Sequence, residues 1–201
     1  MDNYSQAVEE IVRHYGQWTP SESPGENDRV ARRLAAVALV IRNNGGDPEL
    51  LIIERAINVN DPWSGHLALP GGRIEPADAD LIDTAIRETR EEVNLNLDRT
   101  SSIIGHLTPL APVSPRVPPV TVAPFIALAP KTTDLILSME VARAFWTSLR
   151  ALKNDGRSSS FSMTVGSAQY SWPAYNSDHG PIWGITERII TDFLSRLELT
   201  F

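Results

Sequence analysis

The segment IRETREEVNL places three glutamates within five positions of one another, at Glu88, Glu91 and Glu92. In a helix these residues are three and four positions apart, so their carboxylates share one face about 5–6 Å from each other. Like charges at this spacing repel, and the neighbouring Arg87 cannot neutralise all three. The cluster therefore predicts a bound cation, and carboxylate oxygens are ligands that Mg²⁺ or Mn²⁺ prefers. The alternative is an ordinary solvated helix face in an acidic protein.

A pair of glycines upstream favours the metal site over the solvated face. Gly71 and Gly72 predict a turn, and an acidic loop leads from it into the carboxylate helix. Because glycine has no Cβ, its backbone can approach a metal ion or a phosphate closely, and a carbonyl near Gly72 can serve as an oxygen ligand. Asp78, in the loop, can pair with Arg87 and hold the loop against the helix. The expected metal ligands are Gly72, Glu88, Glu91 and Glu92.

The residues from Gly72 onward resemble the Nudix box. That motif is a glycine, five residues, a glutamate, seven residues, Arg-Glu, an aliphatic residue, any residue, Glu-Glu, any residue, a glycine and an aliphatic residue. This chain matches it at Gly72 and at the pairs Arg87–Glu88 and Glu91–Glu92. The resemblance implies an α+β Nudix fold, in which a mixed β-sheet is sandwiched between helices in α/β/α layers. It also implies a Mg²⁺- or Mn²⁺-dependent hydrolase whose small-molecule substrate is a nucleoside diphosphate linked to another group.

The chain departs from this motif in four places. Asp78 replaces the first glutamate, and one extra residue precedes Arg87. Thr89 replaces an aliphatic residue but keeps a methyl group for packing. Asn94 replaces the last glycine, and asparagine also tolerates the left-handed conformation at a helix C-terminus. None of these changes removes an expected metal ligand.

The extra residue and the upstream segment LLIIERAINVNDPWSGHLALPGG resemble the Nudix branch that cleaves coenzyme A. Two residues differ, because Asp61 stands where that branch has a second arginine and Leu69 replaces a phenylalanine. The resemblance implies hydrolysis of coenzyme A to 4'-phosphopantetheine and 3',5'-ADP. The reversed charge at Asp61 keeps ADP-ribose, NADH, a nucleotide sugar and a dinucleoside polyphosphate open as substrates. The residues shared with the branch are Leu50, Leu51, Arg55, Ala56, Gly65, Pro70, Gly71 and Gly72.

The resemblance also assigns roles to individual side chains. The expected catalytic residues are Arg87, Glu91 and Glu92. Either Glu91 or Glu92 can act as the base toward the attacking water, or the base comes from a loop elsewhere, for which Glu140 is the candidate. A Nudix-fold binding module without catalysis is an alternative of a different class, and loss of a metal-ligand glutamate would mark it. The expected substrate contacts are Arg55, Gly71 and Arg116.

Several of these residues have a second interpretation. Arg55 either contacts a phosphate or pairs with a carboxylate such as Glu54 or Asp61. Arg116 is the only cation in a proline-rich loop and either meets the substrate at the rim or is a solvated loop residue. His66 is expected to be a hydrogen-bonded histidine without a catalytic role. Tryptophans could stack a nucleobase, although core packing is commoner, and none of the four stands out: Trp63, Trp146, Trp172 and Trp183.

Composition narrows the class of protein. The 201 residues, of which 42% are hydrophobic and 21% charged, suffice for one globular domain with a buried core. A net charge of −7 disfavours a nucleic acid or an anionic membrane as the partner. The absence of cysteine excludes disulfides and thiolate metal sites. The start is polar and no apolar run could span a membrane, so we expect a cytoplasmic protein, with a homodimer as a candidate assembly.

These side chains need helices to position them. Apolar spacing predicts an accessory helix within residues 5–15, followed by a linker rich in proline and serine. We therefore divide the chain into residues 1–31 and a Nudix domain over residues 32–201. The carboxylates are expected on a long amphipathic helix from residue 78 to residue 93, and a second amphipathic helix is expected over residues 180–198.

The remaining apolar runs predict strands. Residues 33–42 and 49–57 are joined by NNGGDP and should form a hairpin whose loop is longer than the tightest type. Propensity favours a helix over residues 139–153, but in Nudix proteins the similar segment is a strand followed by a short helix, which the period-two spacing allows. This order of elements fits an α+β fold. Further strands are expected in residues 66–69, 102–110 and 120–128, and in a hairpin around Gly166 formed by residues 158–165 and 168–172.

Overall fold

The computed structural model describes residues 6–16, 33–59, 61, 63–112, 120–155, 159–165 and 168–197. The predicted linker, the expected division between residues 31 and 32, and Arg116 lie outside this part of the chain. Within the described residues, no helix is both long enough and apolar enough to cross a membrane.

A seven-stranded mixed sheet forms the centre of the molecule. Its strands follow the order β3-β2-β1-β6-β5, with β4 paired to β1 and β7 paired to β2. Strands β1 and β6 run parallel, and the other paired strands are antiparallel. The strands are β1 Arg33–Asn44, β2 Asp47–Arg55, β3 Leu67–Ala68, β4 Gly71–Arg73, β5 Ile103–His106, β6 Val120–Leu128 and β7 Val141–Ser148.

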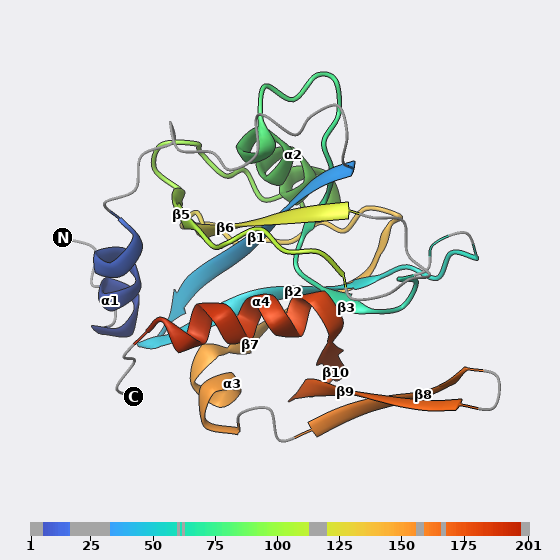
Figure 1. The fold of residues 1–201 in the computed structure, drawn as a ribbon. Coiled ribbons are helices and arrows are strands. Elements are labelled where there is room, and N and C mark those ends of the chain that lie inside the picture. The colour runs from blue at the N-terminus through green and yellow to red at the C-terminus, as the bar shows by residue number, and fades with distance from the viewer. Residues whose placement is uncertain are drawn as a thin grey trace.

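Helices cover both faces of this sheet, which confirms the predicted α/β/α layers (Figure 1). Along β1, Ala36, Ala38 and Val40 face the core beneath α2. The intervening Leu39 and Ile41 face the core beneath α4. A strand that is buried on both faces needs apolar side chains at successive positions, which explains the run LAAVALVI. The helices are α1 Gln6–Tyr15, α2 Leu81–Val93, α3 Leu149–Asp155 and α4 Gly184–Ser195.

The hairpin of β1 and β2 diverges, and the segment that carries the two glycines fills the opening. Strand β1 pairs with β2 over residues 41–44 but with β4 over residues 35–37. The carbonyl of Pro70 accepts a hydrogen bond from Ala38 N at 2.9 Å. The sheet therefore holds Gly71–Gly72 in an ordered strand beside β1, within reach of the helix above.

Two expectations about these elements are wrong. Gly45 and Gly46 alone form the β1–β2 turn, with φ of 59° and 100°, so this is the tightest hairpin type and not a longer loop. Residues 180–183 form strand β10 (Gly180–Trp183) and not the start of the C-terminal helix. Their backbone N–H and C=O groups pair with β9 and therefore do not need the hydrogen bonds of a helix. Helix α4 begins only at Gly184.

A smaller three-stranded sheet lies beside the main one, formed by β8 Ser159–Val165, β9 Ala168–Ser177 and β10. The strands of the predicted hairpin are thus confirmed, while Gly166 itself lies outside the described residues. Strands β8 and β9 project from the body of the molecule, and we call them the β8–β9 arm (Figure 1). The strand expected within residues 139–153 is also confirmed, since β7 pairs along β2 before α3 begins.

Candidate active site

Helix α2, which carries the three glutamates, is capped at both ends. It begins just after Asp80, later than the predicted start at Asp78. The Asp80 carboxylate accepts hydrogen bonds from the backbone N–H groups of Ile82 and Asp83, at 2.9 and 3.0 Å. At the other end Asn94 adopts the left-handed conformation predicted for it, with φ 60° and ψ 25°.

Arg99 also holds the start of this helix, and no sequence pattern indicated it. Its guanidinium pairs with Asp80 and donates a hydrogen bond to Asp83 Oδ1 at 2.7 Å. Because Arg99 follows the helix by several residues, the spacing rules for neighbours on one helix do not reach it. Only the folded chain brings these three residues together.

Arg87 is saturated with protein acceptors. Its Nε and Nη2 donate to the two carboxylate oxygens of Asp78 at 2.9 and 3.0 Å, and Nη2 also donates to the carbonyl of Arg73 at 3.0 Å. Its Nη1 donates to Glu88 Oε1 at 2.9 Å and to Glu91 Oε2 at 3.0 Å. All five guanidinium N–H groups thus meet acceptors, so in this structure Arg87 positions other groups of the site.

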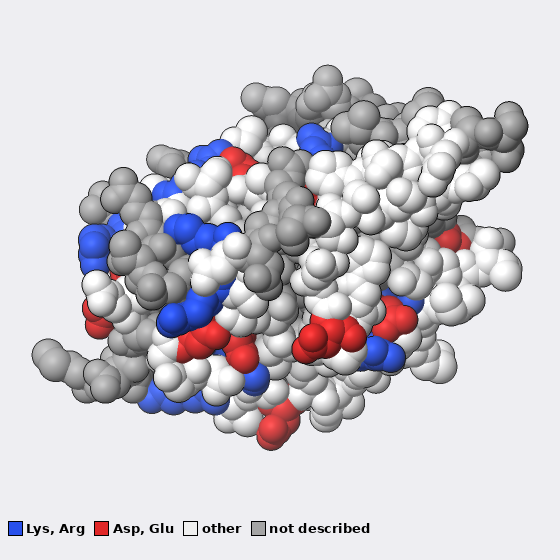
Figure 2. Space-filling model, turned by 90° about the horizontal axis from the view of Figure 1, so that it is seen from below, with Lys and Arg blue, Asp and Glu red and all other residues white. Residues whose placement is uncertain are grey.

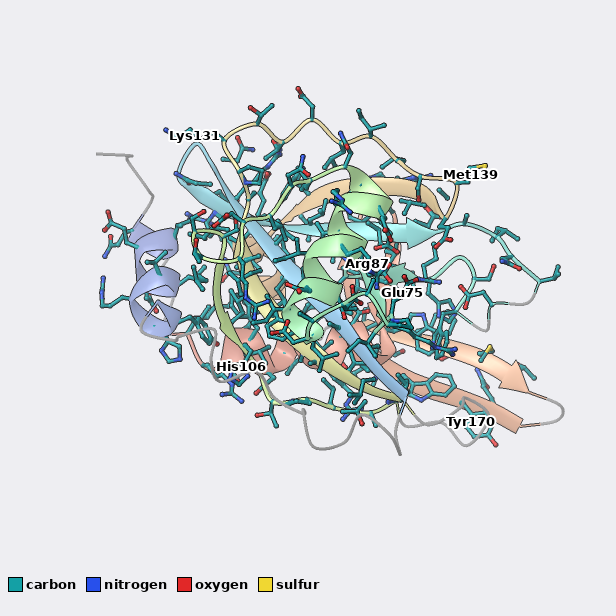
Figure 3. The ribbon with its side chains drawn as sticks, turned by 90° about the horizontal axis from the view of Figure 1, so that it is seen from above. Glu75, Arg87, His106, Lys131, Met139 and Tyr170 are labelled. Atoms are coloured by element: carbon teal, nitrogen blue, oxygen red, sulfur yellow. The ribbon has the colours of Figure 1, made fainter. Side chains whose placement is uncertain are left out.

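The predicted pair of Asp78 and Arg87 is therefore confirmed. The hydrogen bonds from Arg87 lower the pKa of Asp78 to about 2, and those from Asp78 raise the pKa of Arg87. Figure 3 shows Arg87 on α2 next to the loop that carries Glu75. The loop between the glycines and the helix is thus fastened to the helix by an ion pair that stays charged over the whole physiological pH range.

Glu88 and Glu92 meet the glycine segment directly. The backbone N–H of Gly71 donates to Glu92 Oε2 at 2.9 Å. A Cβ on Gly72 would lie 2.3 Å from Glu88 Oε1, so only glycine leaves room for that carboxylate. The sequence therefore needs glycine here for the close approach of two protein groups, in addition to any approach of a ligand.

Burial alters the ionisation of these two carboxyl groups. Glu92 is only 3% exposed, and burial raises its pKa to about 8. Burial also raises the pKa of Glu88, against the opposing effect of the hydrogen bond from Arg87. A carboxyl group buried beside a second carboxylate is not part of an ordinary solvated helix face, so that alternative is wrong for Glu92.

Glu91 is the most exposed of the three glutamates. Its side chain is 52% exposed and turned toward Arg87. Among the residues that the structure describes, no three acidic or imidazole side chains gather closely enough to hold a metal ion. Glu140 is exposed in the loop before β7, its charge contributes to the raised pKa of Glu88 and Glu92, and its carbonyl accepts a hydrogen bond from Ala56 N at 2.8 Å, next to Arg55. The assignments of Glu91 as a ligand and of Glu140 as a base stay predictions.

Arg55, at the end of β2, lies between two carboxylates. It pairs with Asp61, with Nε and Nη2 at 2.9 and 2.8 Å from Oδ2. Its Nη1 is 3.9 Å from Glu92 Oε1. Asp61 is thus neutralised within the protein, as one of the two interpretations of Arg55 requires, while Glu54 pairs with Arg143 instead. A role of Arg55 toward a phosphate stays a prediction.

The residues at this site fit a hard divalent cation. The carboxylates of Glu88 and Glu92 both meet the backbone of Gly71–Gly72, and carboxylate and carbonyl oxygens are the ligands that such a cation prefers. Arg87 pairs with Glu88 at 2.9 Å, whereas Glu92 has Arg55 at the longer distance of 3.9 Å. A cation would supply the missing charge and draw Glu92 into its ionised form.

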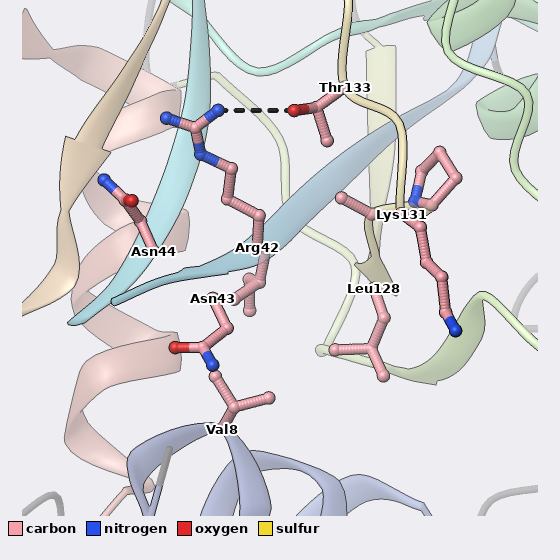
Figure 4. Close-up of a pocket in the computed structure, with 10 residues that line it drawn as sticks. Val8, Arg42, Asn43, Asn44, Leu128, Lys131 and Thr133 are labelled. Atoms are coloured by element: carbon pink, nitrogen blue, oxygen red, sulfur yellow. Dashed lines mark hydrogen bonds between the residues drawn. The ribbon is translucent and has the colours of Figure 1, made fainter. Parts of the chain in front are cut away.

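A cavity of about 500 Å³ lies elsewhere, between the far end of β1, the loop after β6 and α1 (Figure 4). Arg42 lines it, donating to Glu49 Oε2 at 2.6 Å and to Thr133 Oγ1 at 3.4 Å. Strand β1 pairs with Gly72 at Ala36, and Arg42 is six positions further along the strand, which corresponds to roughly 20 Å. The cavity is therefore separate from the carboxylate site.

Comparison with known proteins relates this geometry to a family. The family described as NUDIX domain matches residues 31–164. The human protein named mitochondrial coenzyme A diphosphatase NUDT8 is 31% identical over 172 residues, which cover 81% of this chain and 68% of that protein. The Nudix hydrolase NudL of Citrobacter koseri, described as uncharacterized, is 28% identical over 195 residues, covering 96% of this chain and 95% of the relative.

Solved structures show the same fold. The crystal structure of a MutT/nudix family protein from Enterococcus faecalis matches with a TM-score of 0.59 at 18% identity, covering 95% of this chain and 74% of that one. Identity at this level supports the architecture and not a shared substrate. The mixed sheet between two helical layers is thus an architecture that this chain shares with that protein.

Proposed function

The chain belongs to the Nudix family and is a Nudix hydrolase, and from this premise we propose that it hydrolyses coenzyme A to 4'-phosphopantetheine and 3',5'-ADP with Mg²⁺ or Mn²⁺. The observation that carries the proposal is the convergence of Glu88 and Glu92 on Gly71–Gly72. When bound, a divalent cation neutralises phosphoryl charge and lowers the pKa of water.

The chain's own residues have distinct tasks in this proposal. Glu88 and Glu92 hold the cation, and Gly72 leaves the space in which Glu88 lies. Arg87 fixes Glu88 and Glu91 by one hydrogen bond each, at 2.9 and 3.0 Å. The exposed Glu91 is available to accept a proton from the attacking water, and Glu140 is the alternative base from the neighbouring loop.

Two observations support coenzyme A as the substrate. The upstream segment from Leu50 to Gly72 keeps most of the positions shared with the branch that cleaves coenzyme A, and NUDT8 is named for that activity. Asp61, the main departure, is paired with Arg55, which offsets its negative charge toward an anionic substrate. A cytoplasmic location and a homodimeric assembly stay predictions from the sequence.

The second candidate is another nucleoside diphosphate derivative: ADP-ribose, NADH, a nucleotide sugar or a dinucleoside polyphosphate. Asp61 is the residue that favours it, because a carboxylate at this position can accept a hydrogen bond from a sugar hydroxyl. In that case Asp61→Asn should lower turnover of the preferred compound, whereas turnover of coenzyme A should stay unchanged or rise.

A substrate panel tests the proposal. Wild type, Glu92→Gln and Asp61→Asn are incubated with each compound and Mg²⁺ or Mn²⁺, and products are identified by mass. We expect coenzyme A to be cleaved fastest, with a loss of about 100-fold or more in Glu92→Gln. Glu9→Gln, on the exposed face of α1, is the matched control and should behave as wild type. Clear preference of the wild type for another compound would overturn the assignment of coenzyme A.

A further inference from the structure

One face of the β8–β9 arm is aromatic and the other is polar. Phe161 pairs with Trp172 and Met163 pairs with Tyr170 across the two strands, so these four side chains share a face. Neither strand contains a charged residue, although 21% of the whole chain is charged. Figure 2 shows a wide uncharged area on the side toward which the arm projects. The opposite face carries Ser160, Ser162, Thr164, Gln169 and Ser171.

The rings continue from the arm to the main sheet. Trp183 stacks on Phe161, with ring centroids 4.2 Å apart and planes inclined by 15°. The centroid of Trp172 lies 5.4 Å from that of Trp183 and 5.9 Å from that of Tyr170. On the other side, the imidazole of His66 lies 4.7 Å from Trp183. We call His66, Phe161, Tyr170, Trp172 and Trp183 the aromatic strip.

The aromatic strip begins beside the carboxylate site. The carbonyl of His66 accepts a hydrogen bond from Arg55 N at 3.1 Å. The side chain of the same Arg55 reaches to 3.9 Å from Glu92 Oε1. One residue therefore joins the start of the strip to the most deeply buried carboxylate, and a ligand with phosphates at Glu92 can extend over the rings.

We infer that the aromatic strip binds the planar base of the nucleoside diphosphate substrate, an inference that rests on the proposed function. The rings offer a neutral surface on which any base can stack, and Tyr170 remains 48% exposed at the outer end. A charged part of the substrate gains nothing on a surface without charges, so the diphosphate stays with the cation that Glu88 and Glu92 would hold. The carboxylate site thus binds the anionic part of the substrate, and the aromatic strip binds its planar base.

Binding without metal tests this subsite independently of catalysis. Metal-free wild type is titrated calorimetrically with 3',5'-ADP and, as a probe without a base, with ribose 5-phosphate. We expect 3',5'-ADP to bind the more tightly. Trp172→Leu should lose about 5- to 100-fold in affinity for 3',5'-ADP, because leucine keeps an apolar side chain but offers no ring for stacking. Its affinity for ribose 5-phosphate should not change.

Two further variants separate stacking from structure. Trp172→Phe restores a ring and should recover most of the affinity for 3',5'-ADP. Ser171→Ala alters the neighbouring residue on the opposite face of the same strand and should bind as wild type. In turnover of coenzyme A, the loss in Trp172→Leu should appear in KM and much less in kcat. Equal affinity of wild type and Trp172→Leu for 3',5'-ADP, or equal losses for both probes, would overturn the inference.

The aromatic strip could instead be covered by a second copy of the chain, and sedimentation velocity distinguishes this case. We expect wild type and Trp172→Leu to sediment alike. A dimer in wild type that dissociates in Trp172→Leu would assign the strip to subunit contact and overturn the inference. If coenzyme A is not cleaved by wild type but 3',5'-ADP still binds through Trp172, the proposed function fails and the base-binding subsite stands.

Discussion

The ionisation of Glu92 couples the candidate active site to folding stability. Its pKa is about 8 in the folded chain, against an ordinary value of 4.5. Between these two values the folded state holds a proton that the unfolded state has released, so its stabilising effect is complete below 4.5 and is lost as the pH rises through 8. The metal-free protein should therefore lose stability, on the order of a few kcal/mol, between pH 5 and pH 9.

Urea unfolding of the metal-free protein at several pH values measures this effect. Glu92→Gln keeps an oxygen that can accept the hydrogen bond from Gly71 N but cannot ionise. Its stability should vary less with pH than that of wild type, and it should exceed wild type above pH 8. Parallel curves for the two proteins would show that the folded chain does not hold the carboxyl group in its protonated form.

Gly72 is a second residue at which adding a single carbon atom should change both stability and metal binding. An added Cβ would lie 2.3 Å from Glu88 Oε1, closer than any van der Waals contact permits. Gly72→Ala should therefore lower the free energy of unfolding by about 1–3 kcal/mol and weaken Mn²⁺ binding, and Gly72→Val should do both more severely. Thermal unfolding and calorimetric titration with Mn²⁺ provide the measurements.

A shorter acid at position 88 is the control for this clash. In the Gly72→Ala background, Glu88→Asp withdraws the carboxylate and should recover part of the lost stability, whereas in wild type the same change should give no such gain. If the two changes are simply additive, the effect of Gly72→Ala does not come from its contact with Glu88.

At the scale of elements, the start of α2 depends on Asp80 as a helix cap and as a partner of Arg99. Asp80→Ala should destabilise the protein by about 1–2 kcal/mol and speed amide exchange in the first turn of α2. Asp80→Asn retains the cap but not the charge and should cost less. Asp83→Ala removes the other partner of Arg99 while leaving the cap, so it should not speed exchange in that turn.

Elements were predictable where their signals are local. The pair Asp78–Arg87 joins the helix to the loop just before it, and the left-handed Asn94 stands directly after the helix, and both are present. Residues 180–183 look helical in isolation, but pairing with β9 makes them a strand. The aromatic strip was not predictable either, because alternation within a strand does not reveal which ring of another element lies beside it.

At the scale of the whole molecule, α1 belongs to the core beneath α4. Ile11 is fully buried, and Tyr15 stacks on Phe193 of α4 with ring centroids 6.0 Å apart. Ile11→Ala should lower the free energy of unfolding by about 2–4 kcal/mol, through lost burial and the cavity that remains. The variant should keep wild-type kcat/KM below its melting temperature, because the carboxylates lie across the sheet from α1's core.

Urea unfolding and steady-state kinetics check this prediction. Glu9→Ala, on the exposed side of α1, is the matched control and should change stability little. If Ile11→Ala unfolds with the wild-type midpoint, residues 6–15 are an appendage of the kind expected from the sequence. If the fully folded Ile11→Ala variant loses activity, α1 influences the site through interactions other than the contacts described above.

The hydrogen bonds of Arg87 limit how far the segment between β4 and α2 can vary in length. By bonding both the carbonyl of Arg73 and the carboxylate of Asp78, Arg87 closes residues 74–77 into a ring of fixed circumference. The stretch from Asp78 to the capping Asp80 is fixed as well, because Asp78 Oδ2 accepts a hydrogen bond from Thr84 Oγ1 at 2.9 Å and Ala79 N donates to Asp83 Oδ2 at 3.2 Å. An insertion in either stretch would therefore have to break one of these hydrogen bonds or distort the cap of α2.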